Sequence, residues 1–209
     1  MILVGQYDSP FVRRVAITLH HYGLPFTRNP ISVFGDAAVM ATINPLVRIP
    51  SLVLDDGEVL IDSAAIIDML DERVGPSLAL TPRAGAERRE VLQLVAVATG
   101  AIDKAGAMVY ERHFHAPSAV NETWLMRCRG QLEGALQWLE NRLTGEWLAG
   151  GRFTQADLTT GAMLGYLNLR LAEVLAGSRF ARLKRLSAAC EALPSFTAAR
   201  PSADETMPA

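Results

Sequence analysis

A proline placed directly before a short apolar run constrains the fold of this chain more than any other feature. Pro50 precedes the run Ser51-Leu52-Val53-Leu54, which has the composition of a strand. Because proline donates no backbone hydrogen bond, it belongs at the first residue of a strand or on a sheet edge. An Ile-Pro bond at such a place is a candidate for the cis isomer, which is typical of tight turns. We therefore expect Ile49 to turn its backbone N–H and C=O outward, where an extended peptide can pair with them.

The residues after this strand predict a hairpin that leads into a helix. A turn at Asp55-Asp56-Gly57 is followed by the apolar run Val59-Leu60-Ile61 and then by Asp62-Ser63. Asp and Ser are favoured helix caps, and a helix N-terminus attracts anions. One edge would then offer pairing backbone, a helix N-terminus and a carboxylate. This combination suits a small peptide that carries both an amine and carboxylates.

The first 76 residues predict a small α/β domain with a mixed sheet. Ser9-Pro10 reads as the cap and first residue of a helix that Gly23 closes. The stretch from Phe34 to Ile43 is open between a short helix and a loop. We expect strands at 2–4, 24–27, 51–54 and 59–61, and helices from residue 9 and from residue 63.

The remainder of the chain predicts an all-helical domain. Residues 77–83 form a linker, since Thr81-Pro82 interrupts any continuous helix. Residues 84–209 are rich in Ala, Leu, Glu and Arg and form the second domain. Within it, Thr154-Gln155-Ala156-Asp157 matches a capping box, so we interpret Asp157 as a structural residue rather than a catalytic acid. We expect helices at about 84–110, 120–143, 155–172 and 178–191, with a last turn near 195–199.

Composition and charge exclude several classes of function. The 209 residues carry a net charge of -2, which gives no electrostatic case for nucleic acid or a membrane surface. We find no apolar run of the roughly 18–20 residues that a membrane-spanning helix needs, and no signal peptide. Cys128 and Cys190 lie far apart and fit no metal-ligand spacing. We expect them to stay reduced in a cytoplasmic protein that holds no metal.

Four motifs, in this order, resemble those of cytosolic glutathione transferases: Ser9-Pro10-Phe11-Val12-Arg13, Asn44-Pro45-Leu46-Val47-Arg48-Ile49-Pro50, Asp62-Ser63 and Thr154-x-x-Asp157. The resemblance covers nearly the whole chain, and it is strongest to bacterial members whose first helix starts with a serine. It implies a thioredoxin-like N-terminal domain that binds glutathione and an all-α C-terminal domain that helps bind an electrophile. It also implies a homodimer.

The resemblance gives Ser9 the role of stabilising the glutathione thiolate. Lowering a thiol pKa from about 8.5 by two units needs roughly 2.7 kcal/mol. A hydrogen bond to a charged group supplies about 1.5–3 kcal/mol, and a helix N-terminus adds about 0.3–1 kcal/mol. Ser9 can provide both, and it can also be a plain helix cap. Tyr7 is the rival thiolate donor, because some family classes use a tyrosine at the end of the first strand.

The resemblance also assigns the glutathione-binding residues. Ile49 and Pro50 match the pair that holds the cysteinyl backbone, and Ser63 matches the ligand of the γ-glutamyl carboxylate. Asp62 would lie near the γ-glutamyl amine. Further roles fall to Arg48 at the glycyl carboxylate and to Phe11 at the mouth of the thiol site. Val47 departs from the glycine that is common in this loop. This departure affects the conformation of the loop and hence the reach of the Arg48 side chain.

These observations predict a glutathione S-transferase that conjugates the thiolate to a hydrophobic electrophile, with glutathione as co-substrate and no metal. Glutathione-dependent peroxide reduction or thiol exchange on the same site is an alternative. A non-catalytic interaction module with this fold is another. The helical domain is less informative. Its Met108, Tyr110, Phe114 and Trp124 fit an apolar pocket for the second substrate, and they fit ordinary packing as well.

Overall fold

The computed structural model describes residues 1–205. Contacts divide the chain into two compact units. The first unit holds Met1–Arg83 together with the described residues from Glu191 to Glu205, and the second holds Ala84–Cys190. The sequence predicts a helical domain over residues 84–209, whereas contacts group Glu191–Glu205 with the N-terminal unit.

The first unit contains a four-stranded mixed sheet, and the mixed sheet was predicted. Its strand order is β2-β1-β3-β4. It contains β1 (Ile2–Val4), β2 (Thr27–Asn29), β3 (Ser51–Val53) and β4 (Val59–Leu60). β1 pairs with β2 in parallel and with β3 in antiparallel orientation, and β3 pairs with β4 in antiparallel orientation. The second strand begins at Thr27 rather than Leu24. The sequence leaves the stretch from Phe34 to Ile43 undecided between a short helix and a loop. In the structure this stretch contains a short helix, α2 (Ala37–Ala41).

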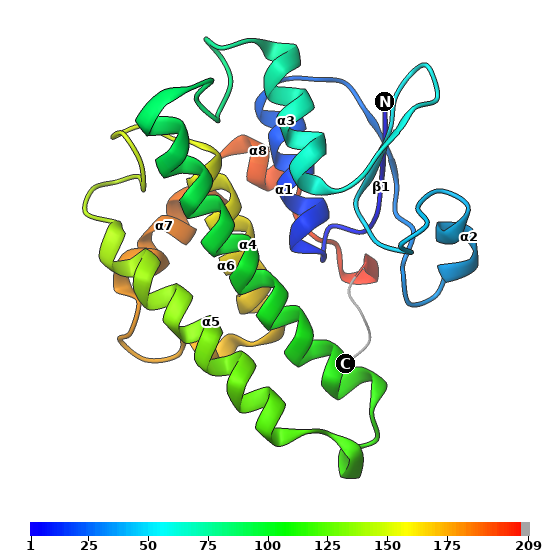
Figure 1. The fold of residues 1–209 in the computed structure, drawn as a ribbon, viewed down its shortest axis with the longest axis vertical. Helices are drawn as coiled ribbons and strands as arrows, with labels where there is room; N and C mark the ends of the chain where they lie inside the picture. Colours follow the sequence, from blue (N-terminus) through cyan, green and yellow to red (C-terminus); the bar gives the residue numbers. More distant parts are fainter. Residues whose placement is uncertain (206–209) are drawn as a thin grey trace. The chain divides into compact units, whose positions relative to one another are not determined.

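Two helices of this unit, α1 (Pro10–His21) and α3 (Ser63–Val74), pack side by side (Figure 1). Val12, Val15 and Leu19 recur at helical spacing along α1, and all three side chains are fully buried. The short helix α8 (Pro194–Ala198) also packs against α1. A 3₁₀ turn at Ala203–Glu205 follows it. This thioredoxin-like unit is the α/β domain that the sequence predicts.

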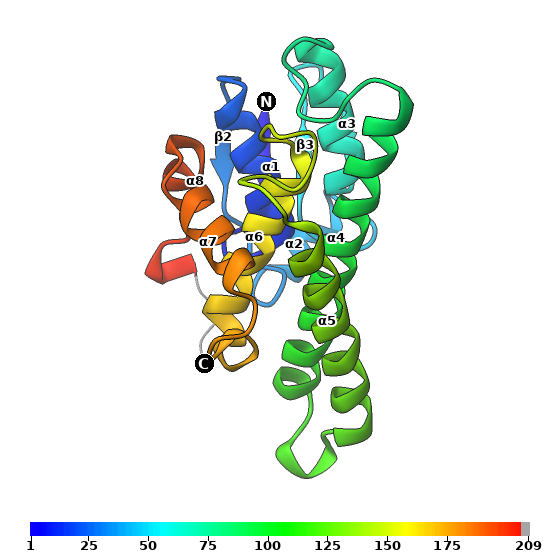
Figure 2. The same cartoon turned by 90° about the vertical axis from the view of Figure 1, so that its left-hand side faces the viewer.

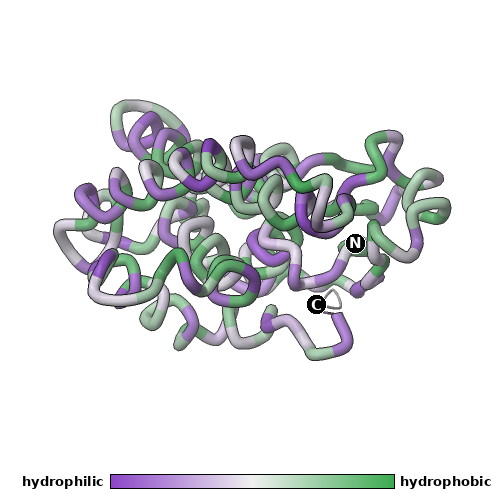
Figure 3. Tube along the Cα trace, turned by 90° about the horizontal axis from the view of Figure 1, so that it is seen from below, coloured by the Kyte–Doolittle hydropathy of each residue, from purple (hydrophilic) through white to green (hydrophobic). Residues whose placement is uncertain are grey.

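The second unit is helical. Its members are α4 (Gly85–Phe114), α5 (Glu122–Arg142), α6 (Gln155–Arg170) and most of α7 (Ala181–Glu191), with 3₁₀ turns at Pro117–Ala119 and Ala172–Leu175. α4 packs along both α5 and α6 (Figure 2). Hydrophobic and hydrophilic stretches are interspersed along the whole trace (Figure 3).

Within residues 1–205, α4 is the one helix that is long and apolar enough to cross a membrane, judged by length and composition alone. Core helices of soluble proteins pass the same test. α4 buries Val91, Leu94, Ala98 and Ile102, among other residues.

The predicted capping box begins α6. Thr154 is the N-cap residue, and the Asp157 carboxylate accepts hydrogen bonds from Thr154 N at 2.8 Å and from Leu148 N at 2.7 Å. Asp157 is fully buried. Its carboxylate therefore satisfies buried backbone donors, which supports the structural interpretation.

Candidate functional site

The sheet topology brings three chain segments to one end of the first unit. In the β1–β3 pair Val4 lies opposite Ser51, so the chain leaves β1 beside the point where it enters β3. In the β3–β4 pair Leu60 lies opposite Leu52, so the chain also leaves β4 there. The loop before α1, the Ile49-Pro50 segment and the start of α3 are therefore neighbours. These segments carry Phe11 and the other predicted site residues: Ser9, Arg48, Ile49, Pro50, Asp62 and Ser63.

Gly5 allows two of these segments to approach closely. A Cβ atom at Gly5 would lie 2.6 Å from Val12 Cγ2 and 2.9 Å from Ile49 Cβ. Its φ of 128° also lies where side chains are rarely tolerated. Only glycine therefore lets the end of β1 pass between α1 and Ile49.

The Ile49–Pro50 peptide bond is cis, as the sequence predicts. The buried amide of Asn44 braces this segment, because its Nδ2 donates to Arg48 O at 2.8 Å and its Oδ1 accepts from Leu46 N at 2.9 Å. An Asx residue before a proline is the local sequence signal for such a brace.

Val47 adopts a left-handed conformation, with φ at 50°. A β-branched residue pays roughly 1–2 kcal/mol for this conformation. The chain thus keeps the backbone that glycine would give the loop, with a valine in its place. The side chain of the neighbouring Arg48 is exposed to solvent.

Ser9 caps α1. Its Oγ accepts a long hydrogen bond from Val12 N at 3.4 Å, and Pro10 occupies the first helical position, as predicted. Because the hydroxyl is the acceptor in this bond, its hydrogen is available to a ligand. Phe11, the next residue along the helix, is partly buried.

Tyr7 lies two residues before Ser9 and is a packed residue. It is 1% exposed, and the Arg28 guanidinium lies 3.5 Å from the centre of its ring. Its hydroxyl is buried with no hydrogen-bond partner among residues 1–205. Burial raises the pKa of Tyr7, against the opposing effect of Arg28, so the phenol stays protonated at neutral pH.

The N-terminus of α3 combines an acid cap with a buried cation. Asp62 is the N-cap residue, and its carboxylate accepts from Ala64 N at 2.9 Å. Ser63 follows it and is 3% exposed, and Arg14 Nη1 of α1 donates to Ser63 Oγ at 3.3 Å.

Burial lowers the pKa of Arg14 to about 10, although the carboxylates of Asp62 and Asp71 oppose this shift. Arg14 therefore remains charged at neutral pH. No local pattern in the sequence predicts the place of Arg14 beside Ser63.

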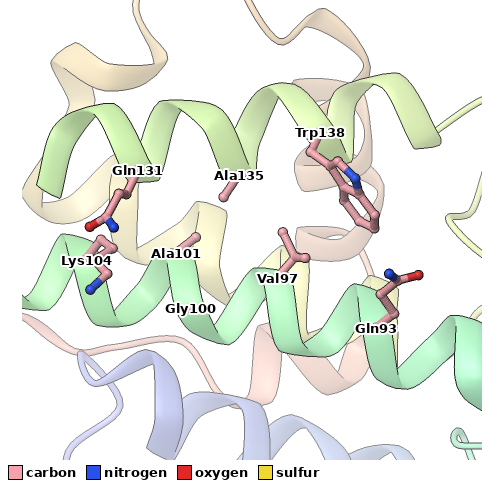
Figure 4. Close-up of a pocket in the computed structure, with 8 residues that line it drawn as sticks. All are labelled: Gln93, Val97, Gly100, Ala101, Lys104, Gln131, Ala135 and Trp138. Atoms are coloured by element: carbon pink, nitrogen blue, oxygen red, sulfur yellow. The ribbon is translucent and has the colours of Figure 1, made fainter. Parts of the chain in front are cut away.

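In the second unit, an open groove of about 430 Å³ lies between α4 and α5. Figure 4 shows Gln131 and Trp138 of α5 on one side and Gln93 and Val97 of α4 on the other. None of the four residues suggested for a second-substrate pocket lines this groove. Met108 is buried, whereas the others, Tyr110, Phe114 and Trp124, are exposed in part.

No group of three or more His, Cys, Asp or Glu side chains that could hold a metal ion is found among residues 1–205. The donor types gathered at the sheet end are instead backbone groups, hydroxyls, helix N-termini and arginines. Such donors suit an anionic peptide-like ligand.

A thioredoxin-like unit followed by this helical unit is the architecture of a glutathione transferase. The sequence model of the glutathione S-transferase N-terminal domain matches residues 3–78, and that of the C-terminal domain matches residues 107–192. The uncharacterized GST-like protein YibF of Escherichia coli K12 is 33% identical, over 81% of this chain and 83% of that protein. The chain belongs to the glutathione S-transferase family.

Two further relatives cover the chain more completely. The maleylacetoacetate isomerase of Pseudomonas aeruginosa is 28% identical over the full length of both chains. A Methylobacterium radiotolerans glutathione S-transferase was crystallised with glutathione sulfonate. It is 30% identical, with a TM-score of 0.90 over 97% of this chain and 95% of that one.

Proposed function

We propose that this protein binds glutathione at the end of the sheet where the three segments meet, and conjugates the glutathione thiolate to a hydrophobic electrophile. The observation that carries the proposal is the convergence of a capping hydroxyl, a cis Ile49–Pro50 edge and the N-terminus of α3 in one place. Solved relatives with glutathione or its sulfonate bound support the choice of ligand.

Each part of glutathione has a matching group. The backbone at Ile49 and Pro50 holds the cysteinyl residue, as a short strand addition. Ser63 and the start of α3 bind the γ-glutamyl carboxylate, while Asp62 faces the amine. The exposed Arg48 reaches the glycyl carboxylate, and Phe11 flanks the thiol.

Ser9 acts as a donor in this proposal and not as a nucleophile. Its hydroxyl hydrogen points to the glutathione sulfur, and the N-terminus of α1 adds a favourable field, so the thiolate forms near neutral pH. The thiol proton passes to water when the thiolate forms. The sulfur lone pair then forms a bond to the electrophilic carbon while the bond from that carbon to its leaving group breaks, so that an aryl halide yields a thioether and a halide ion. Glutathione is a co-substrate, and no step requires a metal.

A second candidate comes from the full-length likeness to maleylacetoacetate isomerase, since the same thiolate could serve an isomerisation. Peroxide reduction or thiol exchange is a third use of this site. A non-catalytic module would need none of these groups.

The products distinguish these activities. The transferase, with an activated aryl halide, yields a thioether and consumes one glutathione for each turnover. A peroxidase yields oxidised glutathione, and an isomerase leaves the glutathione concentration unchanged. A protein that is not retained on immobilised glutathione, and shows no thiolate absorbance with it, is an interaction module. We further propose that the protein is a cytoplasmic homodimer. Size-exclusion chromatography with light scattering tests whether the dimer forms.

A further inference from the structure

A buried arginine lies behind the proposed carboxylate site. Arg14 is 2% exposed, and its Nη1 donates to Ser63 Oγ at 3.3 Å. The two residues are 49 positions apart, on α1 and α3. The Nε of Arg14 is buried and has no hydrogen-bond partner within residues 1–205. A buried charge with an unpaired donor is costly for folding alone, so this arrangement calls for a function.

The bond between these residues fixes the orientation of the serine hydroxyl. A guanidinium has only donors, so Ser63 Oγ must be the acceptor. The hydrogen of the Ser63 hydroxyl is then directed away from Arg14 and can be donated to a ligand. A serine without such a partner could instead rotate and act as an acceptor, which would repel a carboxylate.

The charge of Arg14 adds to the anion preference of the helix start. Ser63 is the first residue of α3, where unpaired backbone N–H groups favour an anion. The carboxylates of Asp62 and Asp71 lie near enough to act on the Arg14 charge. Tyr22 donates its hydroxyl hydrogen to one oxygen of Asp71, while the other oxygen is buried and unpaired. The guanidinium therefore balances local negative charge that would otherwise oppose an incoming carboxylate.

We propose that Arg14 is a positioning residue for the γ-glutamyl carboxylate of glutathione: it holds the Ser63 hydroxyl as a donor and supplies positive charge behind it. This inference rests on the proposed function. It assigns a role to a side chain that does not itself touch the ligand.

The test compares two peptides by calorimetry. One is glutathione, and the other is 4-aminobutyryl-cysteinylglycine, which keeps the amine, the chain and the thiol but lacks the γ-glutamyl carboxylate. The ratio of their dissociation constants measures recognition of that carboxylate. A general loss of structure lowers both affinities and leaves the ratio unchanged, so the ratio separates positioning from stability.

Two variants remove the guanidinium in different ways. Arg14→Met replaces the buried charge by an apolar chain of similar length, and Arg14→Gln keeps a polar end. Arg14→Lys restores a charge and a donor, and Ser63→Ala removes the acceptor. The matched control is Arg13→Gln. Arg13 is also buried on α1, but it pairs with Glu191 at 2.7 Å and donates to Ala199 O at 3.0 Å.

We expect the protein to prefer glutathione over the analogue. Arg14→Met, Arg14→Gln and Ser63→Ala should each reduce this preference about tenfold. Arg14→Lys should keep part of the preference, and Arg13→Gln should leave it unchanged. A folded Arg14 variant with the parent ratio overturns the inference. So does a ratio that Ser63→Ala leaves unaltered, which decides the matter even if no Arg14 variant folds. A parent protein that binds neither peptide refutes the proposed function itself.

Discussion

The carboxylate of Glu205 accepts a hydrogen bond from the backbone N–H of Tyr7, at 3.3 Å and across 198 residues of sequence. Its other oxygen accepts from Arg28, whose guanidinium also covers the Tyr7 ring. Glu205 is buried, in the last turn that the structure describes. This turn thereby holds the loop between β1 and α1, which carries Ser9.

Glu205→Ala should lower the free energy of unfolding by about 1–3 kcal/mol, because it leaves the buried Tyr7 N–H without an acceptor. Urea titration measures the change. Asp204→Ala is the matched control, since Asp204 precedes Glu205 in the same turn but is exposed. We expect the control to stay within about 0.5 kcal/mol of the parent. Equal stabilities for the two variants would show that the Glu205 contact contributes nothing.

Ser9→Ala should raise the thiol pKa of bound glutathione by about one to two units, as expected from losing a charge-assisted hydrogen bond. Thiolate absorbance as a function of pH measures this pKa. The variant should also lose about 1 kcal/mol of stability, because Ser9 caps α1. An unchanged thiol pKa, at full glutathione occupancy, excludes Ser9 as the donor.

Tyr7→Phe is the companion variant. The Tyr7 hydroxyl is buried and has no hydrogen-bond partner among residues 1–205, so its removal should leave stability equal or slightly higher. The thiol pKa should not move. A rise in that pKa for Tyr7→Phe alone would transfer the role of donor to the tyrosine.

The features predicted from sequence and the features missed differ in range. The cis Ile49–Pro50 bond and the caps at Ser9 and Thr154 depend on neighbours a few residues away, so local patterns indicate them. The partners of Arg14 and Glu205 are 49 and up to 198 residues distant. No periodicity or cap signal encodes such pairs, because tertiary packing alone brings them together. The same reason explains why the residues after Glu191 join the N-terminal unit.

Val47→Gly should change stability by less than about 1 kcal/mol, although it removes a partly buried side chain. Relief of the left-handed strain, roughly 1–2 kcal/mol, offsets the lost packing and the added chain entropy. Val33→Gly is the control, since Val33 packs on the same core cluster of Val4, Ile31 and Met40 but has no positive φ. We expect it to cost at least about 2 kcal/mol. Equal losses in thermal unfolding would mean that the strain at Val47 is negligible.

Asp157→Ala should destabilise the helical unit by about 3 kcal/mol, because Leu148 N and Thr154 N lose a buried acceptor. Activity per folded molecule should remain that of the parent. Asn121→Ala provides a comparison, since Asn121 caps α5 on the exposed surface and should cost only about 1 kcal/mol. A folded Asp157→Ala protein with the parent melting temperature would refute the structural role of the capping box.

Glu133 on α5 should give the stability of the protein a pH dependence of known sign. It accepts from Arg129 Nε at 3.0 Å and from Arg179 Nη1 at 3.2 Å, and the hydrogen bond from Arg129 is the main reason that its pKa lies below the ordinary 4.5. The ionised carboxylate therefore stabilises the fold above that value, and the contribution is lost as the pH falls through the lowered pKa. At pH 7, Glu133→Gln should be about 0.5 kcal/mol less stable than the parent.

This difference should shrink as the pH falls through the lowered pKa of Glu133, and it should shrink at about 1 M salt, where surface charges are screened. Urea titrations of both proteins at neutral and acidic pH measure it. If the advantage of the parent over Glu133→Gln grew on acidification, the arginine pair could not be its source, because the carboxylate must lose its charge in that direction.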